Sequence, residues 1–234
     1  VCGAEVSRVE DTITRICRAY KADEVDVFTI TSSIVITIKA EDEIYTQTKR
    51  IHSYETNLDR LDKLNRLSRE ICRTTPPVTY IKEYYNTILE SRTYSFLPVC
   101  GTYGLIALSL TIYFGGNIAD GIVSGILGIL MYLLIFKSED IGANITLVTM
   151  AIAFIIGTLA VISVKLGFGN DLDKIVTGNI MLMIPGVAIT NSLRDMISGD
   201  TMSGLLRFAE SIIKAIAVAA GFVMATVYLG GFIL

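Results

Sequence analysis

Residues 144–164 read NITLVTMAIAFIIGTLAVISV, and no residue of this stretch carries a charge. About 20 apolar residues of α-helix cross the hydrocarbon core of a bilayer, at roughly 1.5 Å per residue. This stretch therefore predicts a membrane-spanning helix. The composition agrees, because the chain is 52% hydrophobic with a mean hydropathy of +0.56. A wholly soluble protein is excluded.

Four further apolar stretches lie on either side of this one, and all five follow residue 95. They predict about five transmembrane helices, at about 96–114, 118–136, 144–164, 175–193 and 208–234. The fourth is polar for a lipid-facing helix, because it contains Asn179, Thr190 and Asn191 and is interrupted by Pro185-Gly186.

The first 95 residues have a different character. They hold 29 of the 43 charged residues, of which 14 are basic and 15 acidic. Apolar residues recur at helical spacing from Val6 to Tyr20, and three short β-branched segments follow at 25–31, 34–39 and 44–51. Residues 57–72 and about 79–91 again have helical spacing. The sequence therefore predicts a polytopic α-helical membrane protein, with an N-terminal cytoplasmic α+β domain at 1–95 and a membrane domain at 96–234.

Several classes of function are disfavoured. The net charge is −3, so the chain lacks the excess of positive charge that attracts nucleic acid, and nucleic-acid binding is not expected. The four cysteines form no C-x-x-C pair and lack a zinc-type spacing with histidine, so no metal or cofactor is expected. The single histidine, His52, has no nucleophile motif around it, and no glycine-rich phosphate loop follows a strand. We therefore expect no enzymatic activity.

The basic residues beside the predicted helices orient the chain. An odd number of spans places the termini on opposite sides, and only Lys165 and Lys174 fall on the side away from the N-terminal domain. The side of that domain carries the larger group, Lys82, Arg92, Lys137, Arg194 and Arg207. The N-terminal domain is therefore predicted to be cytoplasmic, in a multi-pass protein of the cytoplasmic (inner) membrane.

Pro185-Gly186 has two interpretations. Proline lacks an N–H donor and glycine is permissive, so the pair can simply kink a helix that packs against its neighbours. Alternatively it breaks the fourth helix into halves, and the positive N-terminus of the second half faces an anionic substrate group. Both interpretations stay open from the dipeptide alone.

The charged residues before the fifth helix also have two interpretations. Glu210 is three residues from Arg207 and four from Lys214, so it can pair with either at the start of that helix. The alternative is a polar patch at the cytoplasmic mouth of a permeation path, with Asp195 and Glu210 as groups that titrate. Near the second predicted helix, Asp120 is expected to be a helix-start residue.

Two segments together resemble the threonine/serine exporter family, which includes single-chain amino-acid exporters and two-component succinate exporters. The first is Gly3-Ala4-Glu5-Val6-Ser7-Arg8-Val9-Glu10. It is similar to the family's glycine and Arg-Val-Glu near the start of its cytoplasmic domain. The second resembles the family's stretch between its fourth and fifth helices, and comprises Ile184-Pro185-Gly186, Asn191, Arg194-Asp195, Gly199-Asp200, Gly204, Arg207 and Glu210.

The resemblance implies an exporter of small polar metabolites that is driven by an ion gradient. It also implies a partner, because single-chain members carry a second bundle of membrane helices. We therefore expect a smaller all-membrane subunit, a homo-oligomer, or both. The hypothesis is a secondary exporter subunit for a small carboxylate-bearing metabolite, either threonine/serine or a dicarboxylate such as succinate.

The hypothesis assigns a role to each polar residue near the helix break. The substrate-binding group comprises Asn179, Pro185, Gly186, Thr190, Asn191 and Arg194, and the ion-coupling group comprises Asp195 and Glu210. Two alternatives stay open. The chain can be a supporting or regulatory subunit of a partner's pore, or a membrane-tethered hydrolase whose chemistry lies in residues 1–95.

Overall fold

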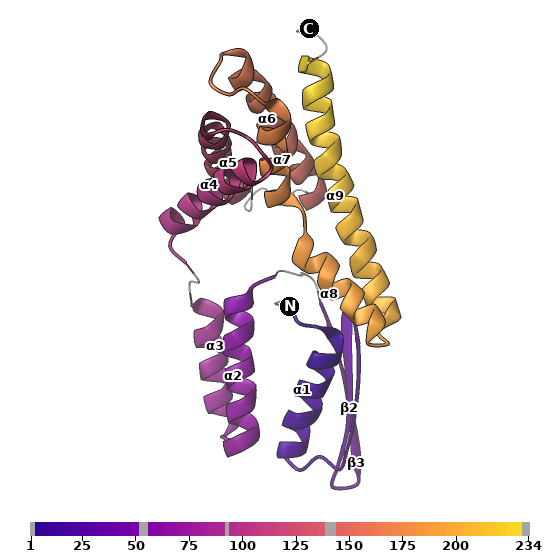
Figure 1. Ribbon diagram of the computed structural model, residues 1–234. Helices are drawn as coiled ribbons and strands as arrows, with labels where there is room; N and C mark the ends of the chain where they lie inside the picture. The colour runs from indigo at the N-terminus through magenta and orange to yellow at the C-terminus, as the bar shows by residue number, and fades with distance from the viewer. Residues whose placement is uncertain (1–2, 52–55, 92–93, 139–143, 231–234) are drawn as a thin grey trace. The chain divides into compact units, whose positions relative to one another are not determined.

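The computed structural model describes residues 3–51, 56–91, 94–138 and 144–230 (Figure 1). They form two compact units. Unit 1 lies within residues 1–93 and 186–209, and unit 2 lies within residues 94–185 and 210–234. His52 and the last four residues of the predicted fifth span lie outside the described residues.

Unit 1 contains a three-stranded antiparallel sheet in the order β1-β2-β3, formed by β1 (Glu24–Ile30), β2 (Ser33–Ala40) and β3 (Glu43–Arg50). Glu41 and Asp42 connect β2 to β3 with φ values of +53° and +64°. Positive φ at both central residues matches the twist of a two-residue hairpin. The helix α1 (Val6–Ala19) packs against β1.

The helices α2 (Leu58–Thr74) and α3 (Val78–Glu90) pack side by side in unit 1. Their shared core contains Leu67, Ile71 and Ile88, and Ile16 of α1 packs against it. Asn57 begins α2 by accepting a hydrogen bond from the Arg60 N–H at 2.9 Å, as expected for an N-cap residue. Two further elements belong wholly or partly to unit 1: α8 (Gly186–Ile197) and the first residues of α9 (Thr201–Gly230).

Unit 2 is a helical bundle of α4 (Phe96–Tyr113), α5 (Ile118–Ser138), α6 (Ile145–Lys165), α7 (Leu172–Met183) and the remainder of α9. Its core includes the fully buried side chains of Met131, Ile156, Ile175 and Phe222.

The helices α4 and α5 approach closely through glycine. A Cβ on Gly128 would lie 2.8 Å from the Cβ of Ala107, and a Cβ on Gly104 would lie 2.7 Å from the Ile129 side chain. Small residues let membrane helices pack backbone to backbone. This contact therefore depends on the absence of side chains at these positions.

Asp120 lies in the first turn of α5, as predicted, and also binds the start of α7. Its carboxylate accepts the N–H of Asn117 at 3.0 Å, and the Asn117 side chain accepts the Asp120 N–H at 2.9 Å. The same carboxylate accepts the N–H groups of Asn170 and Asp171 at 2.6 and 3.1 Å. Asp120 is 1% exposed, so one buried acid caps two helix starts.

Four described helices are long and apolar enough to cross a membrane, and α7 with α8 can make a fifth as one broken span. Apolar side chains on these helices point outward, and Leu105, Ile126 and Val227 are 67%, 61% and 63% exposed. Such surfaces are stable only against lipid or other protein. The predicted fold class, a polytopic helical membrane protein with an N-terminal α+β part, is confirmed.

Candidate functional site

The hairpin of α8 and α9 carries the polar stretch that the sequence singled out. Residues 198–200 connect the two helices, and Gly199 has φ +100°, a conformation that favours glycine. A Cβ on Gly204 would lie 2.5 Å from the Met196 side chain. The two helices therefore pack closely enough for side chains to join them.

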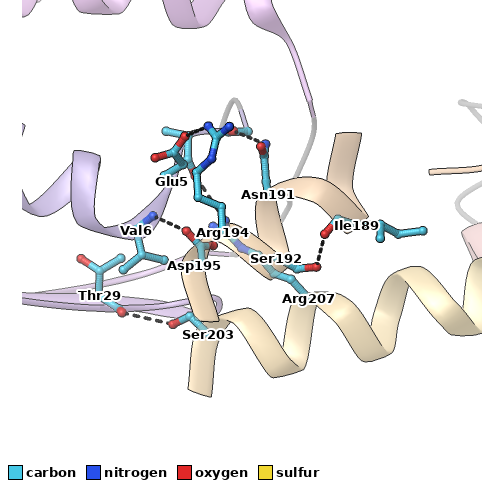
Figure 2. Close-up of polar contacts among 12 residues, drawn as sticks. Glu5, Val6, Thr29, Ile189, Asn191, Ser192, Arg194, Asp195, Ser203 and Arg207 are labelled. Carbon is cyan, nitrogen blue, oxygen red and sulfur yellow. Dashed lines mark hydrogen bonds and ion pairs between the residues drawn. The ribbon is translucent and has the colours of Figure 1, made fainter. Parts of the chain in front are cut away.

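Asp195 and Arg207 form a buried ion pair across this hairpin (Figure 2). Nη1 of Arg207 donates to Oδ2 of Asp195 at 2.8 Å, and the Arg207 and Asp195 side chains are 9% and 1% exposed, respectively. Oδ1 of Asp195 accepts the backbone N–H of Val6 at 3.2 Å. A buried charge is tolerated when it is paired and hydrogen-bonded, and both oxygens of this carboxylate meet that condition.

The N-terminal segment, defined as residues 3–6, binds this hairpin through four successive residues (Figure 2). The contacts are Asn191 Nδ2 donating to the Gly3 carbonyl at 3.3 Å, Arg207 Nη1 donating to the Ala4 carbonyl at 3.2 Å, Arg194 paired with the Glu5 carboxylate, and the Val6 N–H on Asp195. These partners are 188 to 203 positions apart in the sequence. The two segments that carry the family resemblance therefore meet at one site.

A second set of contacts joins the start of α9 to the sheet. Ser203 Oγ donates to the Thr29 carbonyl at 3.4 Å, and the Thr29 N–H donates to the Glu10 carboxylate at 2.8 Å. Burial raises the pKa of the Glu10 carboxyl above its ordinary value, although the Thr29 N–H opposes this effect. The negative charge of Asp200 raises this pKa further.

Unit 1 holds five of the predicted site residues. Asn191, Arg194 and Asp195 lie together in the contacts with the N-terminal segment. Gly186 and Thr190 lie on the same helix, where the exposed Thr190 hydroxyl donates to the Gly186 carbonyl at 3.0 Å. The helix α7 ends at Met183 and α8 begins at Gly186, so the chain leaves the helical conformation at Ile184 and Pro185, immediately before Gly186.

Unit 2 holds Asn179, Pro185 and Glu210. Asn179 is fully buried, and its Nδ2 donates to Ser124 Oγ and to the Ile175 carbonyl, both at 2.9 Å. Glu210 is exposed and lines a hollow of about 390 Å³. Among the described residues it forms no ion pair, and Arg207, one of its two predicted partners, pairs with Asp195 instead.

Glu5 and Glu10 belong to the site, but the sequence showed them only as part of the family-like N-terminal segment and gave them no role. Thr29 and Ser203 also belong to the site and were not singled out from the sequence. No local pattern pairs them with α8 or α9, because the contacts join segments that are far apart in the chain. The co-occurrence of the two family-like segments was the one available signal. Within the described ranges, no group of three His, Cys, Asp or Glu residues is arranged to hold a metal ion.

The site therefore offers a buried, titratable carboxylate, a buried guanidinium and a second arginine at the surface. A sequence profile of the threonine/serine exporter family (ThrE) matches residues 1–229. The chain belongs to this family. It is thus a multi-pass membrane protein of a transporter family, and both segments of the site lie inside the matched residues.

A relative supports the assignment. The "Probable succinate transporter subunit YjjP" of Klebsiella aerogenes is 22% identical over 231 residues, which cover 95% of this chain and 86% of the relative. The comparison with solved structures found no match.

Proposed function

We propose that the protein is a subunit of a secondary exporter that moves a small carboxylate-bearing metabolite out of the cytoplasm. The substrate is threonine/serine or a dicarboxylate such as succinate. The observation that carries this proposal is the family match over residues 1–229. The name of the Klebsiella relative supports a dicarboxylate and a multi-subunit assembly.

The substrate carboxylate binds at the helix break. The first N–H groups of an α-helix lack intrahelical acceptors and carry partial positive charge. Pro185 immediately precedes Gly186, the first residue of α8, and Thr190 and Asn191 on the same helix supply neutral hydrogen bonds. Asn179 does not contact the substrate, because it is fully buried and its amide group already donates to Ser124 and to the Ile175 carbonyl. Arg194 attracts the anion. Because Arg194 is paired with Glu5 and its side chain is 57% exposed, an incoming carboxylate competes with Glu5 for the guanidinium.

Asp195 couples transport to the driving ion. Its protonation removes the negative charge that holds Arg207 and weakens its hold on the Val6 N–H. The link to Val6 joins the hairpin to the N-terminal segment directly. The pair with Arg207 lies within the hairpin and positions the guanidinium that donates to the Ala4 carbonyl, so the proton would loosen both of these contacts with the segment. Glu210 is the other candidate for this role, but its exposed carboxylate lacks an ion-pair partner among the described residues.

Export from vesicles containing the purified protein and its partner subunit tests the proposal. We expect Pro185→Ala, Arg194→Ala and Asp195→Asn each to reduce the initial rate of export at least about tenfold. Arg66→Ala is a matched control, because Arg66 is 70% exposed and lies on α2. Threonine and succinate, measured in parallel, distinguish the two substrate classes. Normal export by all three variants, at normal membrane levels, would remove the proposed site.

We also propose that unit 1 faces the cytoplasm and that the chain works with a smaller all-membrane subunit, a further copy of itself, or both. Cys72 is exposed and reports the orientation. A membrane-impermeant thiol reagent should label Cys72 in inside-out vesicles but not in intact cells. If a partner co-purifies but none of the substitutions in this chain changes the rate of export, the chain is instead a supporting subunit of the partner's pore.

A further inference from the structure

Unit 1 contains a cleft of about 960 Å³, bounded by α1, the sheet, α2 and α8. This volume is near the upper end of the roughly 300–1,000 Å³ that small-molecule sites occupy. Asn191 and Arg207 line the cleft, so it adjoins the polar contacts around Asp195. Of the residues proposed to bind the substrate, only Asn191 lines this cleft.

The lining of the cleft is basic, although the chain as a whole has a net charge of −3. Five arginines line it, against two carboxylates, those of Glu5 and Asp11. The acidic residues of the β2–β3 turn, Glu41, Asp42 and Glu43, are not part of the lining. This segregation of charge concentrates a positive field in the cleft, which attracts anions.

Two of the five arginines are already held by carboxylates. Arg15 pairs with Asp11 at 2.9 Å, and Arg207 pairs with Asp195 at 2.8 Å. Arg8 lies 3.9 Å from Glu5, and its side chain is 79% exposed. It remains accessible to a ligand.

Arg60 and Arg69 of α2 form no ion pair with any residue that the structure describes. Arg60 uses one nitrogen, Nη2, to donate to the Leu89 carbonyl at 3.3 Å. A guanidinium presents five N–H donors in a planar fork that matches carboxylate and phosphate groups. Both arginines therefore retain donors for an anionic ligand.

The spacing of these two arginines restricts the ligand. They are nine residues apart on one helix, which is about 13 Å along its axis and about two and a half turns, so their side chains leave the helix on opposite sides. Between them, Leu64 supplies apolar surface and Asn65 and Ser68 supply neutral hydrogen-bonding groups. A single carboxylate cannot reach both arginines, so a ligand that uses both carries negative charges at more than one position.

We propose that this cleft binds a small organic polyanion, with carboxylate or phosphate groups, and that its occupancy regulates the contacts between the N-terminal segment and the α8–α9 hairpin. A negative ligand beside Arg207 competes with Asp195 and the Ala4 carbonyl for the same guanidinium. Binding rests on the cleft alone. Only the effect on export rests on the proposed function.

The rate of Cys72 alkylation tests binding directly, because Cys72 is exposed and lines the cleft. The full-length chain in nanodiscs is treated with iodoacetamide, a neutral reagent, and the Cys72 peptide is quantified by mass spectrometry. Citrate, ATP and threonine are compared at equal ionic strength. We expect citrate or ATP to slow the reaction at least threefold, and threonine, a zwitterion, to leave it unchanged. Protection by citrate alone indicates carboxylate recognition, and protection by ATP alone indicates phosphate recognition.

Three variants localise the effect. Arg60→Ala and Arg69→Ala should each raise the half-protecting concentration roughly fivefold, the scale of an exposed charge pair. Arg66→Ala is the matched control, because Arg66 lies on the same helix, outside the cleft, paired with Asp62. The inference is overturned if neither anion protects Cys72, if threonine protects it equally, or if Arg60→Ala and Arg69→Ala leave the protection unchanged.

The effect on export is measured separately, in vesicles with the protecting anion added on the side of unit 1. We expect the export rate of the wild type to change with the same half-saturating concentration that protects Cys72. Protection of Cys72 without any change in export overturns the regulatory role but leaves the binding site. If the vesicles export neither threonine nor succinate with or without the anion, while the anion still protects Cys72, the proposed function is refuted and the cleft remains a binding site.

Discussion

Replacing Arg207 by methionine should destabilise unit 1 strongly, because it leaves the Asp195 carboxylate buried without its cation. Asp195 is 1% exposed, and the Val6 N–H would be its one remaining donor among the contacts described above. Breaking one partner of a buried ion pair costs about 3–5 kcal/mol. That cost corresponds to a roughly hundredfold to few-thousandfold loss of protection against local opening.

The chain offers a matched contrast for this effect. Arg66 and Asp62 pair at the same 2.8 Å, but their side chains are 70% and 54% exposed. Arg66→Met should therefore cost only about 0.2–1 kcal/mol. The two substitutions remove the same kind of pair and differ in burial.

Hydrogen–deuterium exchange of the full-length protein in nanodiscs measures the outcome at the amides of residues 6–10. Arg207→Met should accelerate exchange there far more than Arg66→Met does at α2. Adding Asp195→Asn to Arg207→Met removes the uncompensated charge and should restore most of the protection. Equal, small effects of the two single substitutions would refute the argument that burial makes this pair structurally decisive.

Three further predictions concern single groups. Gly178→Ala would place a Cβ 2.1 Å from the Thr111 hydroxyl oxygen. We therefore expect thermal unfolding to show a free energy of unfolding lower by about 1–3 kcal/mol. Gly101→Ala, where the new Cβ would have nothing within 4 Å, is the control, and similar melting of both variants would contradict the packing argument. Asp120→Asn keeps one acceptor oxygen for three backbone N–H groups and should cost about 1–3 kcal/mol for each group left unsatisfied, whereas Asp173→Asn at an exposed site should melt like the wild type. Burial raises the pKa of Glu10 in the folded state, so its stabilising contribution is present below the ordinary value, roughly 4.3, and is lost as pH rises through the raised value. The unfolding free energy of Glu10→Gln minus that of the wild type should therefore increase with pH across this window, and a difference that stays constant would show that Glu10 does not titrate differently on folding.

Much of the local structure could be predicted because its determinants are close in the sequence. Uncharged apolar stretches of about 20 residues predict helices that cross a bilayer. Short runs of β-branched residues, bounded by turn-forming residues, predict strands. Asp120 was predicted at the start of a helix from the neighbouring turn residues. The hydrogen bonds that it accepts from Asn170 and Asp171 could not be predicted, because those donors lie 50 and 51 positions away.

The candidate site shows the same limit. The residues that can bind an anion or titrate were recognisable from charge and from the Pro-Gly interruption, and their functional roles remain proposals. Their partners were not recognisable. The spacing allowed Glu210 to pair with either Arg207 or Lys214, yet Arg207 pairs with Asp195 across the hairpin.

Periodicity, hydropathy and charge were thus sufficient for the class of fold, the approximate helices and strands, and a short list of polar candidates, because each depends on neighbours along the chain. Tertiary packing decided which of these groups are buried and paired. Gly199 and Gly204 allow α8 and α9 to come together, and this contact places Arg207 against Asp195. The N-terminal segment then adds the Val6 N–H. Burial makes that pair costly to break, and only folding in three dimensions produces burial.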